Sequence, residues 1–202
     1  ILGGDKFKRI ATNASTALNE YIYNIKTLGG EIYVCGVFSI DEFSTISFDE
    51  IKLNLVNRTS FCKTSKGLYL FGSIANSILV SDKPVKNAKE YVNFYLEDNR
   101  DKLNRVIDIG EDFEGNIWVA MGMGLCRVTN LKLEDGRTSG ERKFYNEYPV
   151  LSARINSIWI EGKQNIWFAS DKGIAVYDFS TKEMRGYTEI NGVDLTSSTS
   201  VV

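Results

Sequence analysis

The chain has 202 residues, of which 43% are hydrophobic, and its 24 basic and 26 acidic side chains give a net charge of −2 at pH 7. Such a balance of interspersed charges argues against nucleic acid or an anionic membrane surface as the main partner, because both attract a basic face. The sequence contains no histidine, which excludes a Ser-His-Asp or Cys-His mechanism within this chain.

The hydropathy pattern and the first residues bear on location. No apolar run approaches the roughly 18 residues of a transmembrane helix, so we expect no membrane contact within this chain. The sequence starts at Ile1, and no charged segment precedes an apolar one. This start predicts either a cleaved signal peptide or a piece of a longer protein.

One pattern recurs along the chain. It consists of an alternating apolar strand, a polar turn, then Asn-Ile-Trp, an apolar residue and Ala, followed by a short loop, Gly and an apolar residue. Clear copies contain Trp118 and Trp167, and fainter copies surround Tyr33 and Tyr69. A repeat of roughly 35–50 residues built from short strands is typical of a β-propeller, in which each repeat forms one four-stranded blade.

We therefore predict an all-β fold, a β-propeller with about four four-stranded blades that form part of a larger propeller. The predicted blades cover residues 13–53, 54–100, 101–148 and 149–190. Residues 1–12 would end a preceding blade, and residues 191–202 would begin a following blade or form a tail.

The strands of each blade are named A to D from the central channel to the rim. Residues 6–10 read as a strand D, as do residues 46–53 in the first blade and 88–96 in the second. The third blade is predicted to have strands at 105–110, 117–120, 125–129 and 141–148, with a loop over 131–140. The fourth is predicted to have strands at 155–160, 166–169, 174–178 and 184–188.

The cysteines and the acidic turn do not indicate a reactive or metal site. Cys35, Cys62 and Cys126 lack metal or redox spacing and align with small strand positions, so we expect inert core thiols. The segment 111–116 lacks the alternating oxygen ligands and terminal glutamate of a calcium loop, and we expect a turn with solvated charges. We predict no catalytic residue, no metal ion and no cofactor.

The tryptophans call for two interpretations. Trp118 and Trp167 occupy the same position of strand B, and a large aromatic repeated there indicates packing between blades. Trp159 lies in strand A of its repeat, where the aligned residue is the tiny Gly110. It is a candidate either to fill space or to face the channel and meet a ligand.

Ligands of propellers usually meet the face that carries the D–A and B–C connections, an analogy at the level of fold. Arg105 and Arg154 align there, and paired guanidinium groups suit a carboxylate or sulfate on a glycan. The alternative is that both arginines form ion pairs between blades. The full set of candidate ligand-binding residues is Arg105, Arg154, Asn104, Asn156, Tyr21, Trp159, Asp171 and Lys172.

Residues 106–125 carry the motif Ile-x-x-Ile-x-Glu-Asp-x-x-Gly-Asn-Ile-Trp-Val-Ala-x-x-x-Gly-Leu with small departures. This motif resembles the two-component regulator propeller repeat, which builds the periplasmic sensor region of hybrid two-component systems of gut Bacteroidetes. The resemblance covers residues 103–187 well and the first half loosely, where Tyr33 and Tyr69 replace tryptophan. It implies a sensor region of many blades, followed by a β-sandwich, a membrane helix and cytoplasmic kinase and regulator modules. The sequence shows neither the β-sandwich nor any kinase motif.

The resemblance implies a non-catalytic periplasmic sensor segment that recognises an oligosaccharide or similar small ligand, in a protein that forms a homodimer. An alternative is a structural or dimerisation scaffold with ligand binding elsewhere. A third reading is a propeller hydrolase or lyase, which would need a central metal with clustered carboxylates or a general acid and base.

Overall fold

The computed structural model describes residues 22–37, 43–48, 51–85, 89–98 and 104–200. These residues form four four-stranded sheets and a small two-stranded one, and their single helical element is the 3-10 turn η1 (Pro149–Leu151). The predicted all-β, propeller-like fold is therefore confirmed. The predicted strand at 6–10 and the candidate Tyr21 lie outside the described residues.

The first sheet contains β1 (Ile22–Leu28), β2 (Glu31–Gly36), β3 (Phe43–Phe48) and β4 (Ile51–Val56). The second contains β5 (Phe61–Lys63), β6 (Tyr69–Gly72), β7 (Ser77–Ser81) and β8 (Val92–Tyr95). The third contains β9 (Val106–Glu111), β10 (Ile117–Met121), β11 (Leu125–Glu134) and β12 (Arg137–Phe144). The fourth contains β13 (Ile155–Glu161), β14 (Asn165–Ser170), β15 (Gly173–Asp178) and β16 (Glu183–Tyr187), and the hairpin β17 (Glu189–Ile190) and β18 (Val193–Asp194) follows.

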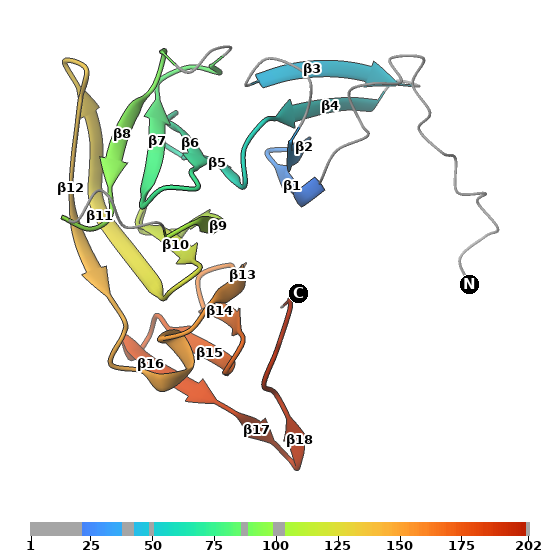
Figure 1. Cartoon of the computed structure of the whole chain (residues 1–202), viewed down its shortest axis with the longest axis vertical. Coiled ribbons are helices and arrows are strands. Elements are labelled where there is room, and N and C mark those ends of the chain that lie inside the picture. The colour runs from blue at the N-terminus through green and yellow to red at the C-terminus, as the bar shows by residue number, and fades with distance from the viewer. Residues whose placement is uncertain (1–21, 38–42, 49–50, 86–88, 99–103, 201–202) are drawn as a thin grey trace.

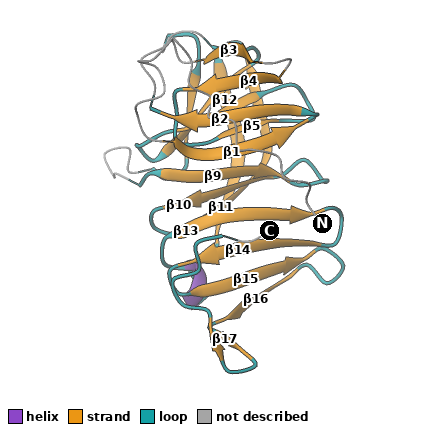
Figure 2. Ribbon diagram, turned by 90° about the vertical axis from the view of Figure 1, so that its right-hand side faces the viewer, coloured by secondary structure: helices purple, strands orange, loops and turns teal. Residues whose placement is uncertain are grey.

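The four sheets follow one another along an arc, with β1, β5, β9 and β13 on its inner side and β3, β8, β12 and β16 on its outer side (Figure 1). After β18 the chain runs back toward the inner strands (Figure 1). Viewed from the open side of the arc, the strands of successive sheets follow one another along the molecule (Figure 2).

The fourth sheet matches its prediction closely. Each of the four predicted strands agrees with the observed one to within one residue at both ends. The strands pair in sequence order and antiparallel, as they also do in the second and third sheets. This is the arrangement expected for a propeller blade.

The first sheet departs from that arrangement. Its order is β1-β2-β4-β3, and β2 pairs with β4 in parallel. The prediction of a single outer strand over residues 46–53 is wrong, because these residues belong partly to β3 and partly to β4. The two strands form an antiparallel pair in which Phe43 lies opposite Val56.

The third sheet has longer outer strands than predicted. The segment 131–140, predicted to be a loop, instead continues β11 and β12 as one hairpin. Its tip is Asp135-Gly136, with φ angles of 51° and 70°. Two successive positive φ angles in an Asp-Gly pair are the signature of a type I′ turn, whose twist matches that of the flanking strands.

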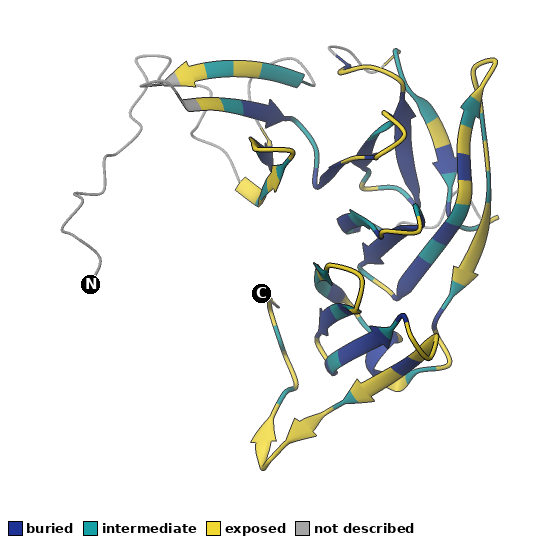
Figure 3. Ribbon diagram, turned by 180° about the vertical axis from the view of Figure 1, so that it is seen from behind, coloured by how far each residue is buried: buried dark blue, intermediate teal, exposed yellow. Residues whose placement is uncertain are grey.

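Aromatic side chains pack one sheet against the next. Trp118 in β10 is fully buried, and its ring centroid lies 5.3 Å from that of Phe168 and 5.1 Å from that of Tyr177 in the fourth sheet. Tyr33 in β2 stacks on Phe61 of the second sheet at 4.6 Å. The predicted packing role of Trp118 is confirmed, and such aromatic pairs add to the area that they bury. Burial concentrates on the middle strands, whereas β12 and β16–β18 carry many exposed residues (Figure 3).

A carboxylate in the turn before strand B holds the repeated aromatic residue. Asp112 accepts hydrogen bonds from Trp118 Nε1 at 2.9 Å and from the backbone amide of Asn116 at 2.9 Å. Trp167 Nε1 donates to Glu161 at 3.0 Å in the same way. Asp112 is only 3% exposed, so the prediction of solvated charges in this turn is wrong for that residue. Its carboxylate is buried because amide and indole donors satisfy it.

The repeat has a glycine after strand B for steric reasons. Gly124 and Gly173 have φ angles of 99° and 136°, which side-chain-bearing residues rarely adopt. A Cβ on Gly173 would lie 2.2 Å from the carbonyl oxygen of Tyr187. The repeat therefore requires glycine where the B–C loop enters strand C.

The three cysteines are free and buried, which confirms the prediction of core thiols. Burial raises the pKa of Cys35 and Cys126 to about 12 and that of Cys62 to about 11. A thiol with such a pKa is protonated near neutral pH, and the thiolate is the reactive form.

Candidate functional site

Three inner strands carry a β-bulge at the same end. The register of each strand shifts by one residue near its start, and the extra residues are Tyr23 in β1, Ile107 in β9 and Asn156 in β13. A bulged residue has no partner in the ladder, and the local twist aims its side chain in a new direction. Three of the four sheets therefore provide one adjustable side chain each at this end.

The three bulged residues line a single cavity of about 240 Å³, which we call the central cavity. Its other lining residues come from the segments that lead into the inner strands and from the C-terminal tail. They are Thr59, Arg105, Arg154 and Thr199. The structure thus brings together three of the predicted residues, Arg105, Arg154 and Asn156.

The two arginines present cationic groups in the central cavity. The guanidinium carbon of Arg105 lies 4.2 Å from the ring centroid of Tyr23, within range of a cation–π interaction. Arg105 Nε is buried and has no hydrogen-bond partner in the described part of the chain. Within the same described residues, no ion pair joins Arg105 or Arg154 to a carboxylate.

Asn104 and Asn156 have different roles. Asn104 is buried and braces the B–C loop, since its amide nitrogen donates to the carbonyl of Met123 at 3.0 Å and its oxygen accepts from the Met123 amide at 2.8 Å. Asn156 Nδ2 donates to Asp171 at 2.8 Å and to the carbonyl of Ser198 at 2.9 Å. Asp171 therefore contacts the central cavity only through Asn156.

The remaining described candidates lie elsewhere. Lys172 is exposed and its ammonium group donates to Ser152 at 3.3 Å. Trp159 pairs with Trp167 across the β13–β14 ladder and is 37% exposed, and it does not line the central cavity. The space beside Gly110 is taken by Ile160, whose Cδ1 would lie 2.9 Å from an added Cβ.

The sequence reasoning missed Tyr23, Thr59, Ile107 and Thr199. Ile107 looks like one member of an alternating apolar strand, and alternation does not reveal a bulge. The signal that was available is the alignment of the repeats, since Ile107 and Asn156 both follow the aligned arginines by two positions.

A second cavity, of about 470 Å³, adjoins the first. We call it the adjoining cavity, and it shares Tyr23 and Thr59 with the central cavity. Arg58 lines it and donates hydrogen bonds to the hydroxyl of Tyr91 and, at 2.9 Å, to the carbonyl of Asn57. The guanidinium carbon of Arg58 lies 5.3 Å from the ring centroid of Tyr91.

A buried carboxylate lies directly behind the central cavity. Asp108 follows the bulged Ile107, is 3% exposed, and lies 2.5 Å from the ammonium nitrogen of Lys26. It also accepts hydrogen bonds from the amide nitrogen of Asn24 at 3.1 Å, the hydroxyl of Ser60 at 3.3 Å and the backbone amide of Ile158 at 3.0 Å. These groups come from the first, second and fourth sheets or the segments that enter them, so one carboxylate in the third sheet contacts all the others.

The charge state of Lys26 follows from this setting. Burial disfavours the ammonium form, but the carboxylate of Asp108 foremost, together with Cys62 and Cys35, outweighs this effect, and the pKa of Lys26 is raised. Lys26 also donates a hydrogen bond to the carbonyl of Ile109. A buried pair of this kind is stable only when hydrogen bonds satisfy its remaining atoms, as they do here.

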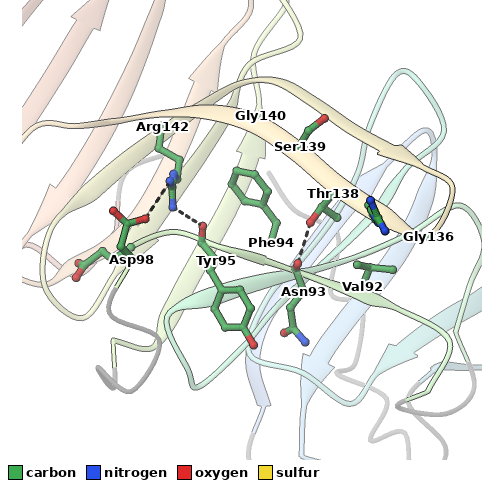
Figure 4. Close-up of a pocket in the computed structure, with 12 residues that line it drawn as sticks. Val92, Asn93, Phe94, Tyr95, Asp98, Gly136, Thr138, Ser139, Gly140 and Arg142 are labelled. Carbon is green, nitrogen blue, oxygen red and sulfur yellow. Dashed lines mark hydrogen bonds and ion pairs between the residues drawn. The ribbon is translucent and has the colours of Figure 1, made fainter.

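A groove of about 790 Å³ runs between β8 and β12 on the outer side of the arc (Figure 4). Thr138 donates to the carbonyl of Asn93 at 2.8 Å, and Arg142 donates to the carbonyl of Tyr95 at 3.1 Å. Arg142 also pairs with Asp98 at 3.3 Å. These polar groups serve the backbone of β8, and no predicted site residue lines this groove.

Comparisons with known proteins give structural neighbours only. No family model matches the sequence, and no curated protein matches it. One similar solved structure is described as the extracellular domain of the hybrid two component system BT3049 from B. thetaiotaomicron, with 20% identity, a TM-score of 0.46, and coverage of 65% of this chain and 17% of that one.

Two further structures are of the extracellular domain of BT4673 from the same organism, described as a one component system in one case and a hybrid two component system in the other. They show 12% and 16% identity, TM-scores of 0.42 and 0.35, and each covers 86% of this chain and 30% of that one. The chain thus spans less than a third of the length of these proteins. In the part of the chain that the structure describes, no helix is long and apolar enough to cross a membrane.

Proposed function

We propose that this chain is a non-catalytic ligand-recognition segment of a periplasmic sensor in a hybrid two-component signalling protein, and that it binds a glycan-derived oligosaccharide in the central cavity. The observation that carries the proposal is the convergence of Arg105, Arg154 and Asn156 on one cavity at the bulged ends of the inner strands. The repeat motif of residues 106–125, with its resemblance to the two-component regulator propeller repeat, supports the assignment to a sensor.

The cavity suits a sensor because several sheets contribute to it. Tyr23 belongs to the first sheet, Ile107 to the third and Asn156 to the fourth. A ligand that contacts all three binds best to one arrangement of the sheets and shifts the population toward it. In the full protein, a homodimer, this shift would change how two subunits pack, and the signal would pass to modules outside this chain.

A thermal-shift screen tests the proposal. The 202-residue chain is heated with a panel of neutral and acidic oligosaccharides, because a ligand that binds the native state raises its apparent Tm. We expect at least one member of the panel to raise Tm, and the variants Arg105→Ala and Arg154→Ala to abolish that rise. Lys132→Gln, which removes one cation from the outer part of β11, is the matched control and should respond as the unmodified chain does.

Two results would contradict the proposal. A rise in Tm that persists unchanged in Arg105→Ala and in Arg154→Ala places binding outside the central cavity. No rise with any oligosaccharide of the panel favours the scaffold alternative, in which the ligand binds elsewhere in the full protein.

A further inference from the structure

We propose that residues 195–200 form a movable strap that closes over the central cavity and competes with a ligand for the side-chain amide of Asn156. The inference rests on the proposed function and deepens it, because it concerns how access to the same cavity is regulated. The strap is the segment that follows the hairpin of β17 and β18, and its closed position is an autoinhibitory contact within the chain (Figure 1).

The strap forms part of the wall of the central cavity. Thr199 lines this cavity together with Arg105, Arg154 and Asn156. After β18 the chain returns toward the inner strands, and the carbonyl of Ser198 reaches the bulged residue Asn156 of β13 (Figure 1). Movement of the strap therefore changes access to the arginines.

The strap is attached to the fourth sheet as a lead-in segment is attached to the sheet before it. The amide of Val106, at the start of β9, donates to the carbonyl of Ser73 at 2.9 Å, and the amide of Ser197 donates to the carbonyl of Asp171 at 3.0 Å. Ser73 and Asp171 both lie in the B–C loops of their sheets. The strap therefore takes the docking position of a segment that enters an inner strand.

Burial distinguishes the strap from the true lead-in segments. Val106 and Ile155, which begin β9 and β13, are fully buried, whereas none of residues 195–200 is buried. Ser197 also has a φ of 62°, in the left-handed region that side-chain-bearing residues rarely adopt. A segment held by hydrogen bonds with little apolar burial opens at a low cost in free energy. The strap can therefore open while the four sheets stay intact.

The side-chain amide of Asn156 is the latch. Its nitrogen carries two hydrogens, and the closed strap uses both, since Nδ2 donates to Asp171 Oδ1 at 2.8 Å and to the carbonyl oxygen of Ser198 at 2.9 Å. A ligand in the cavity that accepts a hydrogen bond from Asn156 must replace one of these two acceptors. Ser198 is the one displaced, because it belongs to the weakly held strap. Ligand binding at this amide therefore opens the strap.

Amide hydrogen exchange, followed by NMR on the 202-residue chain, measures how often the strap opens. The reporter is the amide of Ser197, which is bonded to Asp171 in the closed strap. Asn156→Ala removes the latch, and we expect the Ser197 amide to exchange about three- to tenfold faster, the factor that one hydrogen bond contributes. Asn165→Ala is the matched control, because it removes an amide that bonds Glu161 in the A–B turn, and it should leave this rate unchanged.

Modification of arginine by phenylglyoxal, measured by mass spectrometry, reports access to the cavity without a sugar. Ser197→Pro releases the strap and alters no lining residue, since proline has no amide hydrogen and its φ near −65° excludes the observed 62°. We expect the half-buried Arg105 to react about threefold faster or more in this variant. Ser197→Gly keeps the amide and tolerates a positive φ, so it should react as the unmodified chain does.

Two further comparisons complete the experiment. Arg137, at the start of β12, is exposed and remote from the strap, so it is the internal reference and should react at one rate in all variants. A chain that ends at Asp194 lacks the strap and should match Ser197→Pro, which keeps the test open if that variant fails to fold. An oligosaccharide of the thermal-shift panel that raises Tm should raise it further in Ser197→Pro, because no strap has to be displaced.

The inference is overturned if Asn156→Ala leaves the exchange of the Ser197 amide unchanged, or if Arg105 reacts equally fast with and without the strap. An equal rise in Tm for the unmodified chain and Ser197→Pro would also overturn it. Exchange and modification need no oligosaccharide, so they decide the strap whatever the screen shows. A rise in Tm with an immobile strap keeps the proposed function alone, and a latched strap without any rise in Tm keeps the strap alone.

Discussion

The ammonium nitrogen of Lys26 in β1 lies 2.5 Å from the carboxylate of Asp108 in β9, so one ion pair joins the inner strands of the first and third sheets. The side chains of Lys26 and Asp108 are 16% and 4% exposed. The carboxylate of Asp108 also accepts a hydrogen bond from the backbone amide of Ile158 in the fourth sheet. One carboxylate therefore contacts all three of the other sheets, or the segments that enter them, beside the central cavity.

We expect Asp108→Asn to lower the free energy of unfolding by about 3–5 kcal/mol, because it leaves the charge of Lys26 buried without its partner. Lys26→Met should cost less, since Asp108 keeps the hydrogen bonds from Asn24, Ser60 and Ile158. Urea denaturation of both variants and of the double variant measures the effect. A loss of less than about 1 kcal/mol for Asp108→Asn would show that the pair contributes little.

The same pair predicts a loss of stability in alkali. The pKa of Lys26 is raised above its ordinary value of 10.5 by Asp108 in spite of burial, so its charge is favoured by folding. This contribution is fully present below pH 10.5 and is lost as the pH rises through the higher pKa of the folded state. Urea denaturation on either side of that pH should show a steeper alkaline decline for the unmodified chain than for Lys26→Met, and equal declines would contradict the assignment.

The two tryptophans of the repeat should differ in their contribution to stability. Trp118→Phe removes a fully buried donor from the buried carboxylate of Asp112, and we expect a loss of about 2 kcal/mol. Trp167→Phe removes the same bond to Glu161, but Trp167 is only partly buried, so the loss should be smaller. Urea denaturation checks the order, and a larger loss for Trp167→Phe would contradict it.

Gly173→Ala should be severely destabilising, by about 3 kcal/mol or more, because it combines an unfavourable φ of 136° with a Cβ only 2.2 Å from the Tyr187 carbonyl oxygen. Gly136→Ala is the matched control, since its φ is 70° and no atom lies within 4 Å of the added Cβ. It should cost about 1–2 kcal/mol, the conformational penalty alone. Similar losses of stability for both variants in thermal unfolding would show that the close contact between a Cβ at position 173 and the Tyr187 carbonyl oxygen adds little to the loss.

The three thiols should not react in the native protein. Burial raises the pKa of Cys35, Cys62 and Cys126 well above neutrality, so little thiolate is present and the sulfur atoms are covered. We expect no labelling by an aromatic disulfide reagent at about pH 8 without denaturant, and labelling of all three cysteines in denaturant. Rapid native labelling of any one of them would mean that its strand opens readily.

The sequence predicted best where the repeat is complete. In the fourth sheet the alternation, the turn residues and the glycine all agree, and each strand was placed to within a residue. In the first sheet, two consecutive polar residues, Asp49 and Glu50, interrupt the apolar alternation and mark the reversal that the prediction missed, but nothing in the pattern indicates the parallel pairing of β2 with β4. The Asp135-Gly136 turn was present as a hairpin signal, but the polar composition of the segment outweighed it.

For the site, alignment of the repeats identified the arginines and Asn156, because the side chains that enter the inner strands meet at one end of any such fold. It could not identify Tyr23 or Thr59, since Tyr23 lies in the first sheet and Thr59 in the segment that leads into the second, where the repeat is faint. Nor could it separate Asn104, whose side-chain amide donates to and accepts from the backbone of Met123, from residues that face the cavity. The direction in which a side chain of an inner strand points depends on the bulges, and the apolar pattern does not indicate where a bulge lies.

The placement of Tyr23, Ile107 and Asn156 at bulges separates two properties that are usually coupled in a sheet. A residue inside a ladder serves both its strand partner and whatever it faces, so changing it for one purpose disturbs the other. These three residues have no ladder partner to satisfy. Their side chains can therefore be exchanged, from aromatic to apolar to amide, while the hydrogen bonding of the inner strands stays the same, and one scaffold can present chemically different surfaces to different ligands.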